Sequence, residues 1–207
     1  MLFIAAICTT FSVSAYDFEV DGIYYNKISD TSVEVTHDGS YNNTGVGYNG
    51  VVIIPGIIEI NGITYSVCGI GIRAFSNCPA LTSVTIPDGV TSISIGAFMS
   101  CTSLTEIIIN ENNPNYTSID GVLFNKTYTE LMACPAGKAG IYNIPEGVIS
   151  VCDGAFYSCT GLTSVTIPGG VTSIGNLAFW GCNGLTSVSI PASVTFIGTA
   201  AFCGCSG

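Results

Sequence analysis

Apolar and polar positions in residues 51–207 follow one pattern that returns every 23 residues. The clearest copy is LTSVTIPGGVTSIGNLAFWGC at 162–182, and residues 81–101 and 185–205 repeat its arrangement. In LTSVTI, apolar residues alternate with Thr and Ser, which predicts a short strand with one buried face. Proline ends this strand because it has no N–H to donate to a continuing ladder. VTSI predicts a second short strand, and AFxxC predicts a single turn of helix, or a tighter turn, packed on the core.

The repeat predicts a solenoid, because one unit buries too little apolar surface to fold alone. Stacked units share a core, and their parallel strands lie about 4.8 Å apart. Five units are marked by a phenylalanine followed three residues later by a cysteine: Phe75, Phe98, Phe156, Phe179 and Phe202. The expected fold class is an α/β solenoid, predominantly of short parallel β-strands with one helical turn per repeat.

Two insertions interrupt the regular spacing. The 58-residue gap between Phe98 and Phe156 holds one ordinary unit plus extra chain, in which residues 120–140 predict a hairpin followed by a loop. Residues 56–66 form the second insertion and contain Asn61-Gly62, a strong signal for a two-residue hairpin turn.

The ends of the chain depart from the repeat. Residues 16–50 alternate in short runs, which predicts an antiparallel β N-terminal cap over the first coil. The repeat array spans 51–207, and Gly207 lies one residue before the position of the next repeat's leucine. We therefore expect the array to be truncated at residue 207.

Residues 1–15, MLFIAAICTTFSVSA, predict a secretory signal peptide. Its apolar stretch is too short to span a bilayer, and Val13 and Ala15 are small residues placed for cleavage before Tyr16. A basic n-region is missing, and Cys8 leaves a lipoprotein-type signal as an alternative. Export predicts a secreted or cell-surface location. No other apolar run is long enough for membrane insertion of the mature chain.

Repeats of the form LxxVxIPxxVxxIxxxAFxxC resemble the BspA-like class of leucine-rich repeats, whose unit has 23 residues. SIDGVLFNKTYTELMACPAGK (118–138) and DGIYYNKISDTSVEVT (21–36) resemble that family's irregular hairpin repeat and leading cap. The resemblance covers about residues 51–207. It implies a leucine-rich-repeat protein of the surface or secretions of a host-associated bacterium, and adhesion to host matrix proteins or cells. It implies no shared catalytic residues.

Composition excludes several classes of function. Charged residues make up 9% of the chain, and Lys and Arg total 4 against 14 Asp and Glu, for a formal charge of −10. So few cations cannot neutralise many phosphates, which excludes nucleic acid as a partner. The single histidine, His37, removes most histidine-based catalysis and the commoner zinc sites. Acidic residues occupy no repeated slot, so we expect no enzyme, metal or cofactor.

Ten cysteines in an exported chain would ordinarily predict disulfides. Half of them occupy one repeat slot: Cys78, Cys101, Cys159, Cys182 and Cys205. Stacked equivalents have parallel Cβ vectors, and a run of three cannot all pair. We therefore expect reduced, buried thiols in this slot, where cysteine acts as a small hydrophobic residue.

The outward positions of the first strand are candidate binding residues, since solenoids bind partners on such extended faces. An alternative interpretation is that these hydroxyl side chains only support the sheet. The set is Thr82, Ser83, Thr85, Thr105, Glu106, Ile108, Thr163, Ser164, Thr166, Thr186, Ser187 and Ser189.

The slot after each repeat phenylalanine varies more between units. Tyr157 and Trp180 fall in neighbouring coils and should touch, with Met99 further along. These three could form an exposed apolar stripe, because aromatic and Met side chains are enriched at interfaces. Alternatively they form a partly buried cover over the phenylalanine column.

These observations predict a non-catalytic extracellular or cell-surface module that mediates protein or cell adhesion. The expected partner is a macromolecule, a host protein or glycan. A structural stalk that presents another domain is the alternative, and a glycosidase with paired carboxylates is a third, weaker one.

Overall fold

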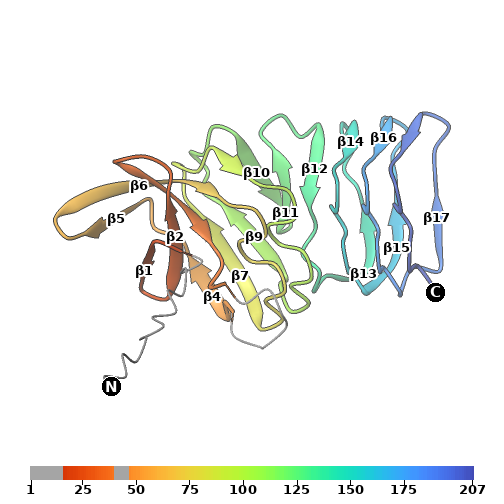
Figure 1. The fold of residues 1–207 in the computed structure, drawn as a ribbon. Helices are drawn as coiled ribbons and strands as arrows, with labels where there is room; N and C mark the ends of the chain where they lie inside the picture. The colour runs from red at the N-terminus through yellow and green to blue at the C-terminus, as the bar shows by residue number, and fades with distance from the viewer. Residues whose placement is uncertain (1–15, 40–46) are drawn as a thin grey trace, which may run out of the picture.

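The computed structural model describes residues 16–39 and 47–207, in which the elements are 18 β-strands and no helix. The predicted signal peptide, residues 1–15, lies outside the described residues. Successive coils are stacked along one axis, and two strand faces run along the stack (Figure 1). The predicted solenoid of short parallel strands is therefore confirmed.

The first strand face is built from the LTSVTI segments and their equivalents. Strands β4 (Gly50–Ile53), β7 (Leu81–Ile86) and β9 (Glu106–Ile109) form one parallel sheet. Strands β13 (Ala139–Asn143), β15 (Gly161–Thr166) and β17 (Ser187–Ser189) form another. Equivalent residues are aligned, as Val165 is opposite Val188, so the 23-residue offset sets the register.

The second strand face is built from the VTSI segments. Strand β6 (Ile63–Ile70) lies between β3 (Ser32–Thr36) and β8 (Ser92–Ile93) and is parallel to both. Further along, β12 (Glu130–Ala133), β14 (Ser150–Val151), β16 (Ser173–Ile174) and β18 (Phe196–Ile197) continue in parallel. Both faces therefore divide into an N-terminal and a C-terminal block.

Antiparallel pairing departs from the parallel coils in three regions of the described chain. Strands β1 (Phe18–Val20), β2 (Ile23–Lys27) and β3 pair antiparallel at the N-terminal end of the stack. Strand β5 (Ile57–Ile60) pairs with β6 and projects from it (Figure 1). That hairpin turns at Asn61 and Gly62, whose φ values of 53° and 78° fit a two-residue turn. Strand β11 (Val122–Asn125) pairs antiparallel with β10 (Tyr116–Ile119) on one side and with β12 on the other.

The expected helical turn per repeat is wrong. The AFxxC segments are turns, and two residues in each have positive φ, such as Leu177 (54°) and Gly181 (70°) around Phe179. A right-handed helix cannot contain such residues in each turn. Alternate N–H groups of each turn bond to the next coil, as Phe156 N does to Ala178 O at 2.7 Å, and the others bond within the turn, as Tyr157 N does to Gly154 O at 3.0 Å. Coil-to-coil bonding thus replaces helical bonding, and the fold is a β-solenoid.

Cysteine thiols of the repeat also form hydrogen bonds between neighbouring coils. The nine described cysteines are free thiols; of the five in the repeat slot, four are buried as expected and Cys205 is half-buried. The Cys101 thiol donates to Phe75 O at 2.8 Å, and the Cys205 thiol donates to Phe179 O at 3.1 Å. These two thiols therefore donate to a carbonyl of the preceding coil, whereas the Cys78 thiol donates to Ser76 O of its own coil at 3.9 Å.

The core consists of two clusters of buried side chains, one in each block. The β10–β11 hairpin lies between them, because Leu123 belongs to the first cluster and Val122 to the second. We call the boundary between the blocks the seam: it separates β8 and β9 from β12 and β13, and no strand pairing crosses it in the described part of the chain.

One polar side chain, that of Asn113, satisfies backbone groups that the seam leaves open. Asn113 is fully buried; its Nδ2 donates to Pro87 O at 3.0 Å and Val90 O at 2.9 Å. Its Oδ1 accepts from the Asn115 and Tyr116 N–H groups, each at 2.9 Å. These bonds hold the irregular hairpin on the preceding coil where a regular ladder is missing.

Candidate functional site

The candidate residues of the first strand face form rows across the coils. Ser83 is opposite Glu106, and Ser164 is opposite Ser187. The next row places Thr85 opposite Ile108 and Thr166 opposite Ser189. The seam divides these rows, so the predicted face is two three-stranded surfaces rather than one continuous sheet.

Exposure differs among these candidates. Ser83 is only 5% exposed, so its expected exposure is wrong: β7 lies between β4 and β9, and Val51 and Glu106 flank Ser83 in register. Thr85 and Ser164 are half-buried. The exposed members are Thr82, Thr105, Glu106, Ile108, Thr163, Thr166, Thr186, Ser187 and Ser189.

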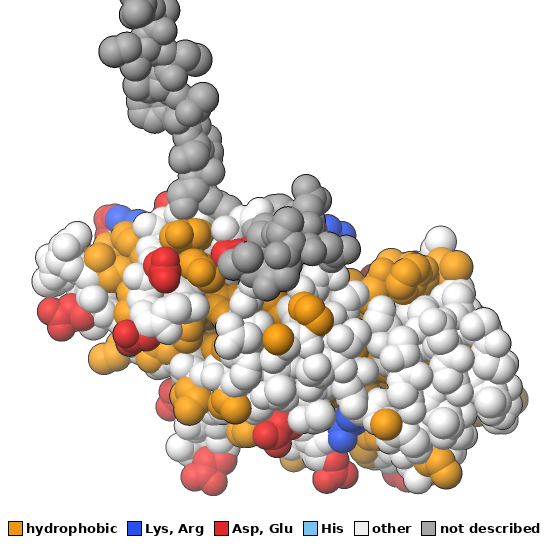
Figure 2. Space-filling view, turned by 90° about the horizontal axis from the view of Figure 1, so that it is seen from below, with side chains coloured by type: hydrophobic (Ala, Val, Ile, Leu, Met, Phe, Trp, Pro, Cys, Tyr) orange, Lys and Arg blue, Asp and Glu red, His pale blue; other side chains and the backbone are white. Residues whose placement is uncertain are grey.

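Threonine hydroxyls on this face support the ladder. Thr105 Oγ1 donates to Thr82 O at 3.2 Å, and Thr186 Oγ1 donates to Thr163 O at 3.5 Å. These side chains therefore contribute to coil stacking, which is the sheet-supporting alternative. Figure 2 shows uncharged polar side chains and backbone covering most of the C-terminal half, with scattered charged side chains.

Sequence reasoning missed three exposed apolar residues on the same face. Val51, Ile53 and Ile141 are 64%, 67% and 72% exposed. Val51 and Ile141 are opposite Ser83 and Ser164 in the strand register, so they occupy the outward slots of their coils. Aligning GVVI and AGIYN to LTSVTI would have revealed them, although these segments lack the repeat leucine.

The predicted stripe residues lie in the turns that follow the phenylalanine column. The Tyr157 and Trp180 rings are stacked, with centroids 4.6 Å apart and planes at 13°. Both side chains are half-buried, and so is Met99. Met99 reaches across the seam, since its Cε lies 2.1 Å from the position that a Cβ on Gly154 would occupy. The structure therefore brings the three residues into one row.

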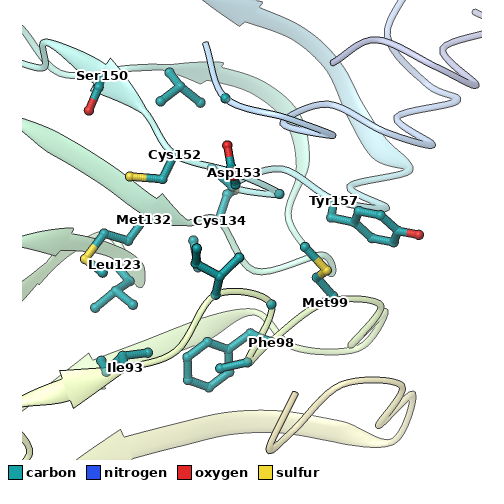
Figure 3. A pocket seen from close by; sticks show the side chains of 18 of the residues that line it. Ile93, Phe98, Met99, Leu123, Met132, Cys134, Ser150, Cys152, Asp153 and Tyr157 are labelled. Atoms are coloured by element: carbon teal, nitrogen blue, oxygen red, sulfur yellow. The ribbon is translucent and has the colours of Figure 1, made fainter. Parts of the chain in front are cut away.

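A cavity of about 380 Å³ lies at the seam, beside this row (Figure 3). We call it the seam cavity. Ile93, Phe98 and Met99 line one side, and Leu123, Met132, Cys134, Val151, Cys152, Asp153 and Tyr157 line the rest. Most of these side chains are apolar, and four carry sulfur. Sequence reasoning did not find the cavity, because it arises only where the coils lose their regular stacking.

The electrostatics of the seam cavity favour uncharged contents. Asp153 is its only charged lining residue, and its two carboxylate oxygens accept from Asn176 N at 2.6 Å and Asn176 Nδ2 at 3.1 Å. Burial raises the pKa of the Cys152 thiol to about 11, so this cysteine is neutral at physiological pH.

A second depression of about 380 Å³ lies on the other side of Met99 and Tyr157. Its lining is polar and includes Arg73, Asn77 and Ser100. His37 also lines it, and burial lowers the pKa of this imidazole. Met99 and Tyr157 therefore separate an apolar cavity from a polar one.

Within the described residues, no group of three His, Cys, Asp or Glu side chains could hold a metal ion. The same part of the chain contains no helix long and apolar enough to span a bilayer.

The comparisons with known proteins agree with this architecture. A family model described as the BspA type leucine-rich repeat region matches in six copies over residues 57–141 and 138–207. The chain belongs to the BspA-type leucine-rich-repeat family. Leucine-rich-repeat proteins generally bind other macromolecules and are generally non-catalytic. A search of curated proteins finds no match.

Three solved structures resemble this BspA-type chain. A leucine-rich repeat protein from Eubacterium ventriosum is 32% identical, with a TM-score of 0.68 over 75% of this chain and 40% of that one. A leucine-rich cell surface protein from Faecalibacterium prausnitzii is 30% identical, with a TM-score of 0.52 over 91% and 52%. A leucine-rich repeat protein from Bacteroides ovatus is 30% identical, with a TM-score of 0.53 over 92% and 45%. The chain therefore spans about half or less of these proteins.

Proposed function

We propose that this chain is a non-catalytic module of the bacterial surface or extracellular space that binds a protein partner in adhesion. Residues 1–15 would direct its export, and the similarity to a cell surface protein supports that location. The binding site that we propose is the apolar stripe of Met99, Tyr157 and Trp180.

The observation that carries the proposal is the stacked Tyr157–Trp180 pair beside two depressions of opposite character. Aromatic and methionine side chains are enriched in protein interfaces, and Trp and Tyr are enriched among the few residues that carry most of the binding energy. The stacked rings are already held in one orientation, so less side-chain entropy is lost when a partner binds. The Ser and Thr of the strand face are under-represented among such energetic contacts.

The net charge limits the choice of partner. With a formal charge of −10, the chain repels acidic surfaces and attracts basic ones. Arg73 beside the polar depression is one of only 4 cationic side chains in the whole sequence. A neutral or basic protein surface with exposed apolar side chains fits the stripe better than an acidic glycan does.

The test is a binding array of extracellular-matrix proteins and glycans probed with the full chain. A protein hit is then titrated with the Tyr157→Ser/Trp180→Ser variant. We expect Kd to rise at least tenfold with the melting temperature unchanged. The matched control is Thr166→Ala/Ser189→Ala, which removes two outward side chains of the strand face and should leave Kd within twofold.

Four results would contradict the proposal. Loss of folding in the stripe variant would show that the two rings are a structural cover. Loss of binding in the strand-face variant alone would move the site to the sheet. Binding only to glycans would replace the protein partner, and absence of any hit would favour the stalk.

A further inference from the structure

Strand β4 is the first strand of its sheet, and its outer edge is open. It pairs with β7 on one side, and no described strand pairs with it on the other. The strands of the N-terminal cap do not cover this edge, because β3 pairs with β6 in the sheet of the second strand face. The cap therefore continues the second strand face, while the first strand face begins with an unpaired strand.

The open edge presents the backbone groups of Val51 and Ile53. Gly50 N donates to Ala80 O at 2.9 Å, and Ile54 N donates to Thr85 O at 3.0 Å, so the backbone groups of Gly50 and Ile54 face β7. Backbone groups alternate in direction along a strand, which turns the N–H and C=O groups of Val51 and Ile53 to the open side. Two donors and two acceptors are therefore in place for a further strand.

The side chains of this edge are apolar and exposed. Val51 and Ile53 are 64% and 67% exposed, and the sequence of β4, GVVI, contains no charge. Proteins commonly protect edge strands with a charged side chain. The two outer strands of the neighbouring sheet, β1 and β5, each contain one, Glu19 and Glu59. Strand β4 lacks this protection, as expected of an edge that accepts another strand.

A groove of about 520 Å³ lies along this edge. We call it the edge groove. Val51 and Ile53 line it from β4, and residues 20–25 line it from the β1–β2 hairpin. Tyr48, also in the lining, holds the hairpin in position, because its hydroxyl accepts a hydrogen bond from Tyr24 N at 3.1 Å. The groove is therefore formed by the folded chain before any partner binds.

The charge around the edge groove favours a cationic occupant. Asp21 is the only charged side chain among the described residues that line it. Burial, followed by the charges of Glu19 and Asp38, raises the pKa of Tyr24, another lining residue. Figure 2 shows acidic side chains among hydrophobic ones at the N-terminal end of the stack. A lysine or arginine beside Asp21 is therefore attracted, whereas a second copy of this chain brings a formal charge of −10.

We propose that the edge groove binds an extended segment of another protein, which adds to β4 as a further strand. The segment alternates apolar residues with lysine or arginine. Its backbone bonds to the open groups of Val51 and Ile53, and one of its cations lies near Asp21. This interaction goes beyond the proposed function and does not depend on it, because the edge groove shares no residue with the stripe.

The test uses the full chain and a capped heptapeptide of alternating lysine and valine, titrated by calorimetry. We expect saturable binding at one site. The same peptide with every amide N-methylated keeps its side chains but cannot donate to β4, and should bind at least tenfold more weakly. Glutamate in place of lysine should weaken binding at least tenfold as well. Amide hydrogen exchange at Val51 and Ile53 should slow at least tenfold in the complex.

Two variants locate the site. Ile53→Lys puts a cation on the open edge and should weaken binding at least tenfold. Asp21→Asn removes the charge of the groove and should raise Kd at least threefold, while asparagine still tolerates the φ of 50° at this position. The matched control is Ile141→Lys, at an exposed isoleucine of β13, another outer strand, which should leave Kd within twofold.

Five results overturn the proposal. They are no binding at millimolar concentration, equal binding of the N-methylated peptide, an unchanged Kd in Ile53→Lys, loss of binding in Ile141→Lys alone, and a dimer that Ile53→Lys dissociates in sedimentation, which would make the occupant a second copy. If Ile53→Lys fails to fold, hydrogen exchange at Val51 and Ile53 of the unchanged chain decides. The stripe is tested separately, by Tyr157→Ser/Trp180→Ser, so failure of one proposal is distinguishable from failure of the other.

Discussion

The Cys182 thiol donates a hydrogen bond of 3.0 Å to the carbonyl oxygen of Phe156, which lies 26 residues earlier in the chain. Cys101 and Phe75 are related in the same way, at 2.8 Å. The slot is suited to cysteine because its side chain is small, apolar and able to donate to one carbonyl. Within the described chain, the repeat thus uses thiols as links between coils without disulfides.

Replacing Cys182 by alanine should lower the free energy of unfolding by about 1–2 kcal/mol. The substitution removes a fully buried sulfur and leaves the Phe156 carbonyl without its donor. Urea unfolding measures the change. The matched control is Cys203→Ala, at an exposed thiol, which should change stability by less than about 0.5 kcal/mol. Equal effects in the two variants would contradict a role for the buried thiol.

Gly175→Ala should destabilise the chain by about 3 kcal/mol or prevent folding. A Cβ on Gly175 would lie 2.5 Å from Asp153 N and 2.7 Å from the Cys152 carbonyl carbon, so the backbones of two coils would have to separate. Gly169→Ala is the control, because a Cβ there meets no atom within 4 Å. Thermal unfolding compares them, and a tolerated Gly175→Ala would show that the coils are less closely packed than described.

Asn113→Ala should lower the free energy of unfolding by about 3 kcal/mol, because buried backbone groups that Asn113 now satisfies would lose their partners. Its side-chain amide makes four hydrogen bonds and is fully buried. Asn112→Ala tests the neighbouring asparagine, which is exposed, and should change stability by less than about 0.5 kcal/mol. Similar urea midpoints for the two variants would show that Asn113 does not hold the hairpin.

Stability should fall as pH rises above about 9. Burial raises the pKa of the Cys101 and Cys182 thiols from 9.0 to about 12, and that of Cys78 to about 11. As pH rises, the unfolded chain releases these protons first, so stability is full below about pH 9 and is lost between about pH 9 and 12.

Urea unfolding at pH 7, 9 and 10.5 measures this dependence. A Cys101→Ala/Cys182→Ala variant is the control and should lose less stability between pH 9 and 10.5 than the unchanged chain. Identical slopes would show that the buried thiols do not cause the alkaline loss. Tyr25 and Tyr48 are also buried with raised pKa values, so a residual slope is expected in the variant.

Much of the fold could be predicted from the 23-residue pattern. The alternation in LTSVTI identified the inward residues Leu162 and Val165, which are buried. The 23-residue spacing predicted the register that aligns Val165 with Val188. The helical turn was wrong, because the segment around Phe179 has helix-compatible residues whose N–H groups bond to a neighbouring coil. A single unit contains no information about that neighbour.

The candidate site, too, could be predicted only in part from the sequence. The contact between Tyr157 and Trp180 followed from their equivalent slots in adjacent coils. The burial of Ser83 could not be predicted from the sequence, because it depends on the side chains that the flanking strands place beside it. The seam cavity could not be predicted, since the 58-residue gap between Phe98 and Phe156 shows that extra chain is present without showing how it folds.

The sequence by itself determined the repeat, its register and its buried residues, because apolar side chains at fixed spacing have only one way to share a core. The tertiary structure alone decided the placement of Cys134 where other coils have a phenylalanine, the two blocks and the cavity between them. The physical reason is that an irregular coil is shaped by hydrogen bonds to its neighbours, such as those of Asn113, which no local pattern specifies.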